Sequence, residues 1–201
     1  MRLLRNTFAL GGALLLAAGT AVAVVSGAAA PGFTITDTAG KAEQLADYKG
    51  KYVVLEWTNP ECPFVRKHYS SGNMQALQKE WGSRDVVWLA INSNNASISE
   101  FKSPRDMKSW MEGHSAAPSA ILLDSTSATG RAYSAKTTPH MFVVDPGGKV
   151  VYAGAIDDKR STNPADAKTA HNYVRAALTE AMSGKPVAVA NTTPYGCTIK
   201  Y

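Results

Sequence analysis

The turn around Cys62 constrains the fold of this chain more than any other feature of its sequence. An apolar run over residues 52–57 stops at Asn59-Pro60, and the chain restarts after Cys62-Pro63. A short run rich in β-branched and aromatic residues predicts a buried strand, and proline is favoured in the first turn of a helix. The pattern therefore predicts a strand, a turn and a helix, with the Cys62 thiol at the N-terminus of that helix.

The position of Cys62 favours redox chemistry. Peptide dipoles and free N–H groups at a helix N-terminus stabilise a thiolate, which is the nucleophilic form of cysteine. Arg66 and Lys67 follow closely and are expected to add positive potential. The other cysteine, Cys197, lies near the end of the chain, which indicates a redox pair rather than a disulfide framework. A buried, unreactive thiol at Cys62 is the structural alternative.

Residues 1–23 have the pattern of a signal peptide. Arg2 and Arg5 precede an uncharged run over residues 8–25, and Ala21-Val22-Ala23 has the form of a signal-peptidase site. We expect export to the periplasm. The alternative is a retained membrane anchor, because the run is about long enough to span a bilayer.

The charge of the exported part argues against nucleic acid as a partner. Without residues 1–23 the net charge falls from +5 to +3, because two arginines and no acidic residue are removed. The remaining basic residues are scattered and form no stripe interleaved with aromatic residues. No other apolar run is long enough for a membrane span, so no membrane partner is expected once the signal peptide is removed.

Strands and helices alternate along the rest of the chain. Strands are expected at residues 33–36, 53–57, 85–92, 120–124, 141–144 and 149–153, and helices at residues 63–69, 74–81, 103–112, 128–135 and from Asn163 to about 184. This alternation predicts an α/β fold, in which a mixed sheet has helices on both faces and an antiparallel edge. We divide the chain into a linker at 24–32, one domain at 33–184 and an irregular tail at 185–201 that carries Cys197.

Four segments resemble the thioredoxin fold in its peroxiredoxin-like branch, the alkyl hydroperoxide reductase and thiol-specific antioxidant family. They are the Cys62 turn at 57–64, Thr138-Pro139, the approach to the central strand at 45–51, and the tail at 194–201. The resemblance covers about residues 31–201. It implies a thioredoxin-like redoxin domain in which Pro139 follows a cis peptide bond and faces Cys62; an ordinary trans turn is the alternative.

Three positions depart from the patterns of this group. Val65 stands where a thioredoxin carries its second cysteine, so no local dithiol can form. Thr58 lies four residues before Cys62, whereas a typical peroxiredoxin has its threonine three residues before. Thr138-Pro139 occupies the place where a peroxiredoxin is expected to carry an arginine. The site is therefore a hybrid of the two.

The resemblance implies an exported thiol-dependent oxidoreductase that reduces peroxides. Cys62 is the expected nucleophile and Cys197 the resolving thiol, and an external thiol reductant restores the pair. One alternative is thiol–disulfide exchange on protein substrates. Another is a non-enzymatic exported domain with a structural Cys62–Cys197 disulfide. The disulfide can form within one chain or between the two chains of a homodimer.

Five further residues complete the predicted site. Glu56, six residues before Cys62, is a candidate proton shuttle, unless its side chain reaches solvent at the sheet end. Thr58 is expected to bond the thiolate or a peroxide oxygen, or else to cap the strand. Thr138 and Pro139 face Cys62. His140 either tunes the thiolate or points away from it.

No metal or organic cofactor is expected. His68, His114 and His171 have no partners at the spacing of metal ligands. Asp157-Asp158 is expected in a solvated loop rather than at an ion.

Overall fold

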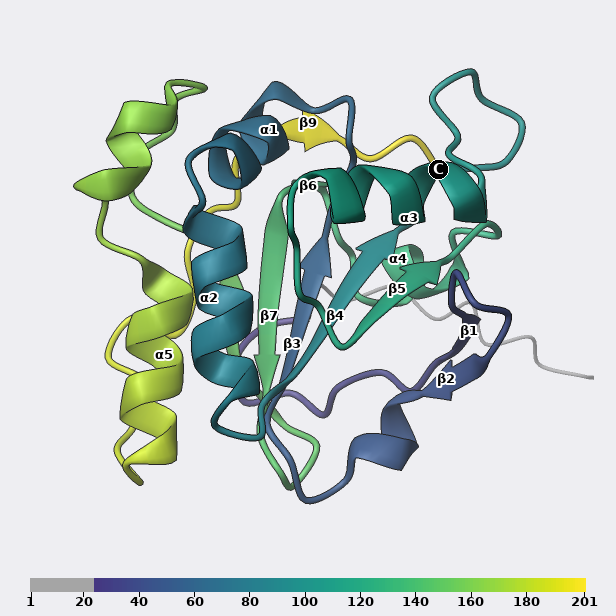
Figure 1. Ribbon diagram of the computed structural model, residues 1–201. Helices are drawn as coiled ribbons and strands as arrows, with labels where there is room; N and C mark the ends of the chain where they lie inside the picture. Colours follow the sequence, from purple (N-terminus) through teal and green to yellow (C-terminus); the bar gives the residue numbers. More distant parts are fainter. Residues whose placement is uncertain (1–23) are drawn as a thin grey trace, which may run out of the picture.

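A computed structural model describes residues 24–201 and shows a five-stranded mixed sheet at the centre of the molecule (Figure 1). The strand order is β5-β4-β3-β7-β8. The bounds are β3 Val53–Trp57, β4 Val87–Asn92, β5 Ala120–Leu123, β7 His140–Val144 and β8 Val150–Gly154. The strands β3, β4 and β5 run parallel, and β7 and β8 are antiparallel to their neighbours. The predicted α/β fold with a mixed sheet is confirmed.

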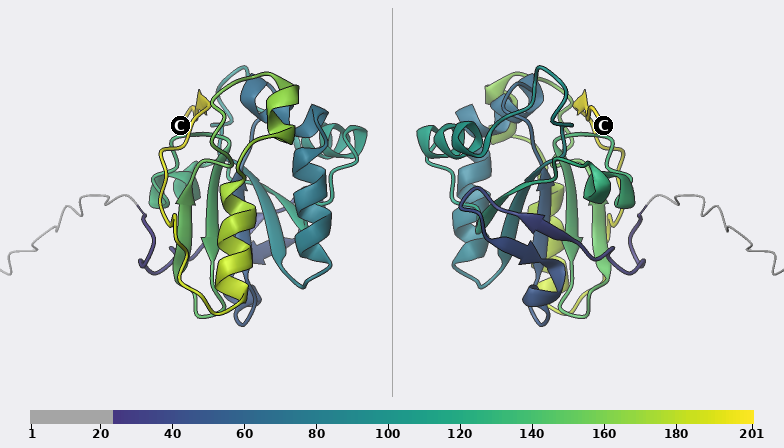
Figure 2. Two further views of the ribbon diagram at one scale, coloured as in Figure 1. Left: turned by 90° about the vertical axis from the view of Figure 1, so that its left-hand side faces the viewer. Right: turned by 90° about the vertical axis from the view of Figure 1, so that its right-hand side faces the viewer.

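Helices cover both faces of this sheet (Figure 2). One face carries α1 Pro63–Ser70, α2 Asn73–Gly82, α3 Pro104–Gly113 and α5 Tyr173–Met182. The other carries α4 Ala128–Ala132 and the hairpin of β1 Thr34–Thr36 and β2 Ala42–Gln44. Short 3₁₀ helices lie at Leu45–Tyr48 and Pro164–Lys168.

The central strand β3 divides the interior into two cores. All five of its residues are buried, as expected for a strand covered on both faces. Val54 belongs to the core under the four helices, whereas Leu55 and Trp57 belong to the core under α4 and the hairpin. Successive side chains alternate between faces, so Glu56 shares the face of Val54.

The last helix begins later than the sequence predicts. Asn163 caps only the 3₁₀ helix, where its side chain accepts a hydrogen bond from Ala165 N at 3.1 Å. A second cap, Asn172, then accepts from Arg175 N at 2.9 Å and starts α5 at Tyr173. The chain is held between the two helices by an antiparallel bridge from Asn172 to Asp157, so the segment cannot continue as one helix.

The tail is more regular than predicted. Ala153 N donates to Ala190 O, and Thr192 N donates to Ala153 O, both at 3.0 Å, so the tail follows the free edge of β8. It then forms the strand β9 Cys197–Thr198, which pairs antiparallel with β6 Thr137–Thr138. The expectation of an irregular tail is wrong in this respect, because edge groups of the domain satisfy its backbone.

The segment predicted as a linker also lies against the domain. Gly27 N donates to Val150 O at 2.8 Å, and Ala30 N donates to Gly148 O at 2.9 Å. The predicted signal peptide at 1–23 lies outside the described residues. Within residues 24–201, no helix has both the length and the apolar character needed to cross a membrane.

We predict that Gly154→Ala separates the tail from β8. Gly154 has φ +150°, and a Cβ atom there would lie 2.5 Å from the carbonyl oxygen of Thr192. We expect the free energy of unfolding, measured in urea, to fall by about 2 kcal/mol in this variant. Gly113→Ala is the control, because a Cβ at Gly113 meets no atom within 4 Å. Equal stability of the two variants would contradict this account.

Candidate active site

Cys62 lies at the N-terminus of α1, as its sequence context predicts. It is the N-cap residue, and its carbonyl accepts the first helical hydrogen bond, from Arg66 N at 2.9 Å. The residue is only 1% exposed. Its Sγ donates to the carbonyl oxygen of Thr138 at 2.9 Å.

The Thr138 carbonyl is presented to Cys62 by the start of β7. The peptide bond between Thr138 and Pro139 is cis, the geometry that the resemblance implies. His140 pairs with Trp57 across the sheet, so the residues just before β7 reach the same end of the sheet as the turn that follows β3. This register brings residue 138 to residue 62.

The tail brings Cys197 to the same place. Cys197 is the register partner of Thr138 in the β6–β9 pair. Gly196 has φ +143°, and a Cβ there would lie 2.6 Å from the Thr138 carbonyl carbon, so the tail passes in close contact with this peptide. Burial, and then the neighbouring Cys62 sulfur, raise the pKa of Cys197 to about 12. Both cysteines are free thiols, and Cys197 is the more exposed of the two.

The two basic residues after Cys62 are already paired with acids. The Arg66 guanidinium donates to Pro60 O and to a Glu61 oxygen, each at 2.7 Å. The buried Lys67 ammonium lies 3.4 Å from a carboxylate oxygen of Asp157. The expected positive potential at Cys62 is therefore largely compensated by these two carboxylates.

Glu56 is fully buried and hydrogen bonded. Its carboxyl oxygens accept from Tyr69 Oη and Trp88 Nε1 at 2.7 Å and from Gln78 Nε2 at 3.3 Å. Burial raises the pKa of Glu56, and these donors oppose the rise by stabilising the carboxylate. The side chain does not reach solvent at the sheet end.

Two buried hydroxyl groups near this end of the sheet have no hydrogen-bond partner within residues 24–201. They are Thr58 Oγ1 and Thr138 Oγ1. Thr58 is otherwise fixed through its backbone, because its carbonyl accepts from Asn92 Nδ2 at 3.0 Å. Thr58 Oγ1 is close enough to the Glu56 carboxyl to oppose the rise that burial gives to the pKa of Glu56. Thr138 Oγ1 is free to bond a group that enters the site.

His140 lies on the other face of the sheet. Its ring packs 4.5 Å from that of Phe142, which belongs to the core under α4, and its Nδ1 accepts from Lys136 N at 3.2 Å. Cys62 belongs to the opposite core. Among the predicted site residues, His140 is the one that the structure directs away from the two thiols.

A buried polar cluster beside Cys197 was missed by the sequence analysis. It consists of Lys67, His68, Asp157 and Tyr195, of which Asp157 is only 2% exposed. The expectation that Asp157 lies in a solvated loop is wrong, because Lys67 of α1 pairs with it across 90 residues of sequence. The sequence offered one signal for this cluster. Lys67 and His68 are adjacent polar residues on the buried side of a predicted helix, where they need polar partners.

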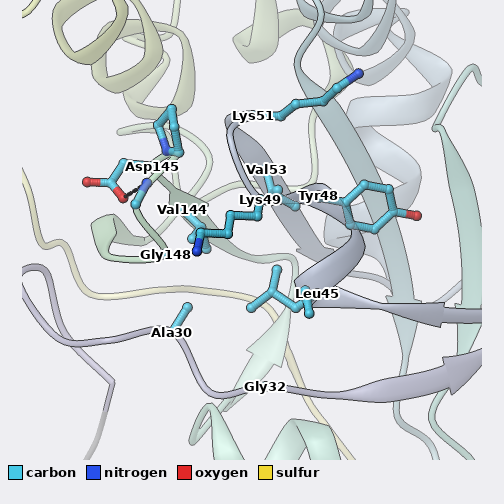
Figure 3. Close-up of a pocket in the computed structure, with 13 residues that line it drawn as sticks. Ala30, Gly32, Leu45, Tyr48, Lys49, Lys51, Val53, Val144, Asp145 and Gly148 are labelled. Atoms are coloured by element: carbon cyan, nitrogen blue, oxygen red, sulfur yellow. Dashed lines mark hydrogen bonds between the residues drawn. The ribbon is translucent and has the colours of Figure 1, made fainter.

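A pocket of about 250 Å³ lies at the opposite end of the sheet (Figure 3). Its labelled lining residues are Ala30, Gly32, Leu45, Tyr48, Lys49, Lys51, Val53, Val144, Asp145 and Gly148. Val53 begins β3, whereas Cys62 follows the end of that strand. The pocket is therefore separate from the thiols. Within the described residues, no group of three or more His, Cys, Asp or Glu side chains is arranged to hold a metal ion.

Comparison with known proteins assigns this arrangement to a family. Residues 26–153, more than half of the chain, match the AhpC/TSA family. The chain belongs to the AhpC/TSA family. The resemblance seen in the sequence to a thioredoxin-fold redoxin is thereby confirmed.

This AhpC/TSA protein is also similar to individual relatives. A Bacillus subtilis (strain 168) protein named thiol-disulfide oxidoreductase ResA is 30% identical over 128 residues, which cover 64% of this chain and 66% of that protein. The match thus spans slightly less than two thirds of that relative. The crystal structure of an uncharacterized conserved protein from Geobacillus kaustophilus has a TM-score of 0.77 and 32% identity, and the match covers 88% of this chain and 92% of that one. A putative thiol:disulfide interchange protein DsbE from Chlorobium tepidum shares the fold, with a TM-score of 0.60, 21% identity and coverage of 80% and 99%.

We predict that His140 makes this protein sensitive to acid. Burial lowers the pKa of His140 from 6.5 to about 3, so the folded state takes up this proton later than the unfolded state as the pH falls. The stability from this group is present above pH 6.5 and is lost between pH 6.5 and about 3. The free energy of unfolding, measured in urea, falls as the pH is lowered through this window. We expect His140→Phe to reduce that fall by up to about 4 kcal/mol. Parallel curves for wild type and variant would contradict the prediction.

Proposed function

We propose that this protein is a thiol–disulfide oxidoreductase in which Cys62 is the nucleophile and Cys197 the resolving thiol. The observation that carries the proposal is the register of Cys197 opposite Thr138, because the Thr138 carbonyl also accepts the hydrogen bond of the Cys62 thiol. One backbone group thus holds the two cysteines together. The names of relatives such as ResA support the same reaction class.

The reaction proceeds by two exchanges of a sulfur–sulfur bond. The Cys62 thiolate attacks a substrate disulfide, forms a mixed disulfide and releases the first substrate thiolate. The Cys197 thiolate then attacks Cys62 Sγ, forms the Cys62–Cys197 disulfide and releases the second thiolate. Each released thiolate takes up a proton. The substrate is reduced by two electrons, and an external thiol reductant restores the two cysteines.

Disulfides are better supported as substrates than the peroxides that the resemblance first implies. A peroxide site needs donors that stabilise the leaving oxygen. Arg66, the basic residue nearest in sequence to Cys62, donates its hydrogen bonds to Pro60 O and Glu61. The buried Thr58 hydroxyl, which by distance and angle has no hydrogen-bond partner within residues 24–201, favours peroxide reduction as a second candidate, and the neighbouring Glu56 carboxyl competes for it.

We place Glu56 in the proposal as a proton carrier. It shares the face of β3 that packs against the core of Cys62, and burial raises its pKa. A carboxyl group with a raised pKa keeps its proton to a higher pH than an exposed one, which suits a proton carrier. The proposal also includes export, because the sequence of residues 1–23 has the signal-peptide pattern.

We predict that Cys197→Ser stops the reaction at the mixed disulfide. The reduced full chain is mixed with one equivalent of dithiobis(nitrobenzoate), and thionitrobenzoate release and protein mass are followed. Wild type should release two equivalents, and Cys197→Ser should release one and retain the adduct on Cys62. Cys62→Ser should react slowly.

The same proteins are then mixed with one equivalent of hydrogen peroxide. Fast loss of both thiols with peroxide, and slow reaction with the disulfide, would replace this proposal by peroxide reduction. Slow reaction with both reagents would leave Cys62 and Cys197 as a structural pair.

We predict that Glu56→Gln slows the disulfide reaction without weakening the fold. The variant keeps the size of the side chain and removes the exchangeable proton, so we expect a rate about tenfold or more lower and a flatter pH profile. Stability at neutral pH should be equal or higher, because a buried carboxylate costs free energy. An unchanged pH profile would remove Glu56 from the mechanism.

A further inference from the structure

The polar cluster beside the tail is a connected set of buried hydrogen bonds. Asn73 Nδ2 lies 3.0 Å from His68 Nδ1, which leaves the proton of the neutral ring on Nε2. Burial lowers the pKa of His68 to about 4, so the ring is neutral at pH 7. His68 Nε2 lies 3.4 Å from Tyr195 Oη, and Tyr195 Oη donates to Asp157 Oδ1.

Lys67, on helix α1, is the fourth member of this cluster. Its ammonium donates to Lys159 O at 2.6 Å, and it lies 3.4 Å from both Asp157 Oδ2 and Tyr195 Oη. The side chains of Lys67 and Asp157 are 0% and 1% exposed. Burial and the bond to Asp157 raise the pKa of Tyr195, which therefore remains a phenol and a donor.

The cluster binds the tail at Tyr195, two residues before Cys197. Tyr195 is 2% exposed and also packs edge-to-face on Phe64 at 5.7 Å. Between Tyr195 and Cys197 stands only Gly196, which is held against the Thr138 peptide. The Tyr195 side chain is therefore a second anchor for the segment that carries Cys197, in addition to the pairing of β9 with β6.

One helix sets the positions of both sulfurs. Cys62 is the N-cap of α1, and Lys67 and His68 lie on the next turn of the same helix. Helix α1 and strand β9 lie side by side at one end of the sheet (Figure 1). A buried ion pair is weak support for stability, because desolvation offsets its attraction, and its attested use is to fix one geometry.

We propose that Lys67, His68, Asp157 and Tyr195 are positioning residues that hold Cys197 for its attack on Cys62 Sγ. This inference rests on the proposed disulfide exchange. The step is the one in which the mixed disulfide on Cys62 is broken, the Cys62–Cys197 bond forms, and the remaining half of the substrate leaves as a thiolate. A thiol held close to the sulfur that it attacks has a high effective concentration, and release of the tail removes this advantage.

The test uses Tyr195→Phe in the full chain, which removes one hydroxyl and keeps the ring. One equivalent of dithiobis(nitrobenzoate) gives two phases, the first from attack by Cys62 and the second from attack by Cys197. We expect the first phase to be as fast as in wild type or faster, and the second to be about tenfold or more slower. Because both phases are read on the same molecules, a general loss of stability does not produce this pattern.

Tyr52→Phe is the matched control. Tyr52 Oη donates to Ala181 O at 2.9 Å, so the control also loses a hydrogen bond of a tyrosine hydroxyl, but at the start of β3, the end of that strand away from Cys62. Both phases should be unchanged in Tyr52→Phe. His68→Gln tests the cluster from helix α1 and leaves the Lys67–Asp157 pair intact, so it provides the same measurement if Tyr195→Phe does not fold.

Two results would have different meanings. A second phase of wild-type rate in a folded variant of the cluster, after a normal first phase, would overturn the inference and leave the proposed function intact. Absence of the first phase in wild type would instead overturn the proposed function.

Discussion

The carbonyl group of Thr138 is the contact on which the rest of the site depends. It accepts the Cys62 thiol, and the same peptide is covered by Gly196 and paired with Cys197. The turn after β3, the start of β7 and the tail therefore meet at one peptide unit. Sheet register explains this arrangement, because Trp57 pairs with His140 and the residues just before β7 therefore lie beside the turn that follows β3.

The two buried acids near this site have different partners. Glu56 has three neutral donors, and burial raises its pKa. Asp157 has an ammonium and a phenol as partners, and it remains a fixed acceptor in the cluster that holds the tail. We therefore assign one buried carboxyl group to proton transfer in the proposed reaction and the other to holding the tail, according to their partners.

The sequence predicted the parts of the fold that depend on local pattern. The strand, turn and helix around Cys62 follow from an apolar run and two prolines, and the mixed sheet follows from the alternation of elements. The predictions failed where a distant partner decides the structure. Asp157 is buried because Lys67 pairs with it, and α5 starts late because Asn172 pairs with Asp157.

In the candidate site, too, some features could be predicted from the sequence and others depended on distant partners. The convergence of Cys62, Cys197 and Thr138 was implied by a resemblance, whereas the place of His140 required the register of β7. Tyr195 gave no local signal, because its burial depends on helix α1 and the loop after β8, both far away in the sequence.

The Lys67–Asp157 pair also limits how this sequence can change during evolution. Loss of either partner alone leaves a buried charge without its counterion, which is far more destabilising than replacement of the whole pair by apolar residues. Single substitutions at these positions are therefore selected against even where the pair adds little stability. Positions 67 and 157 are therefore expected to vary together in an alignment of homologues.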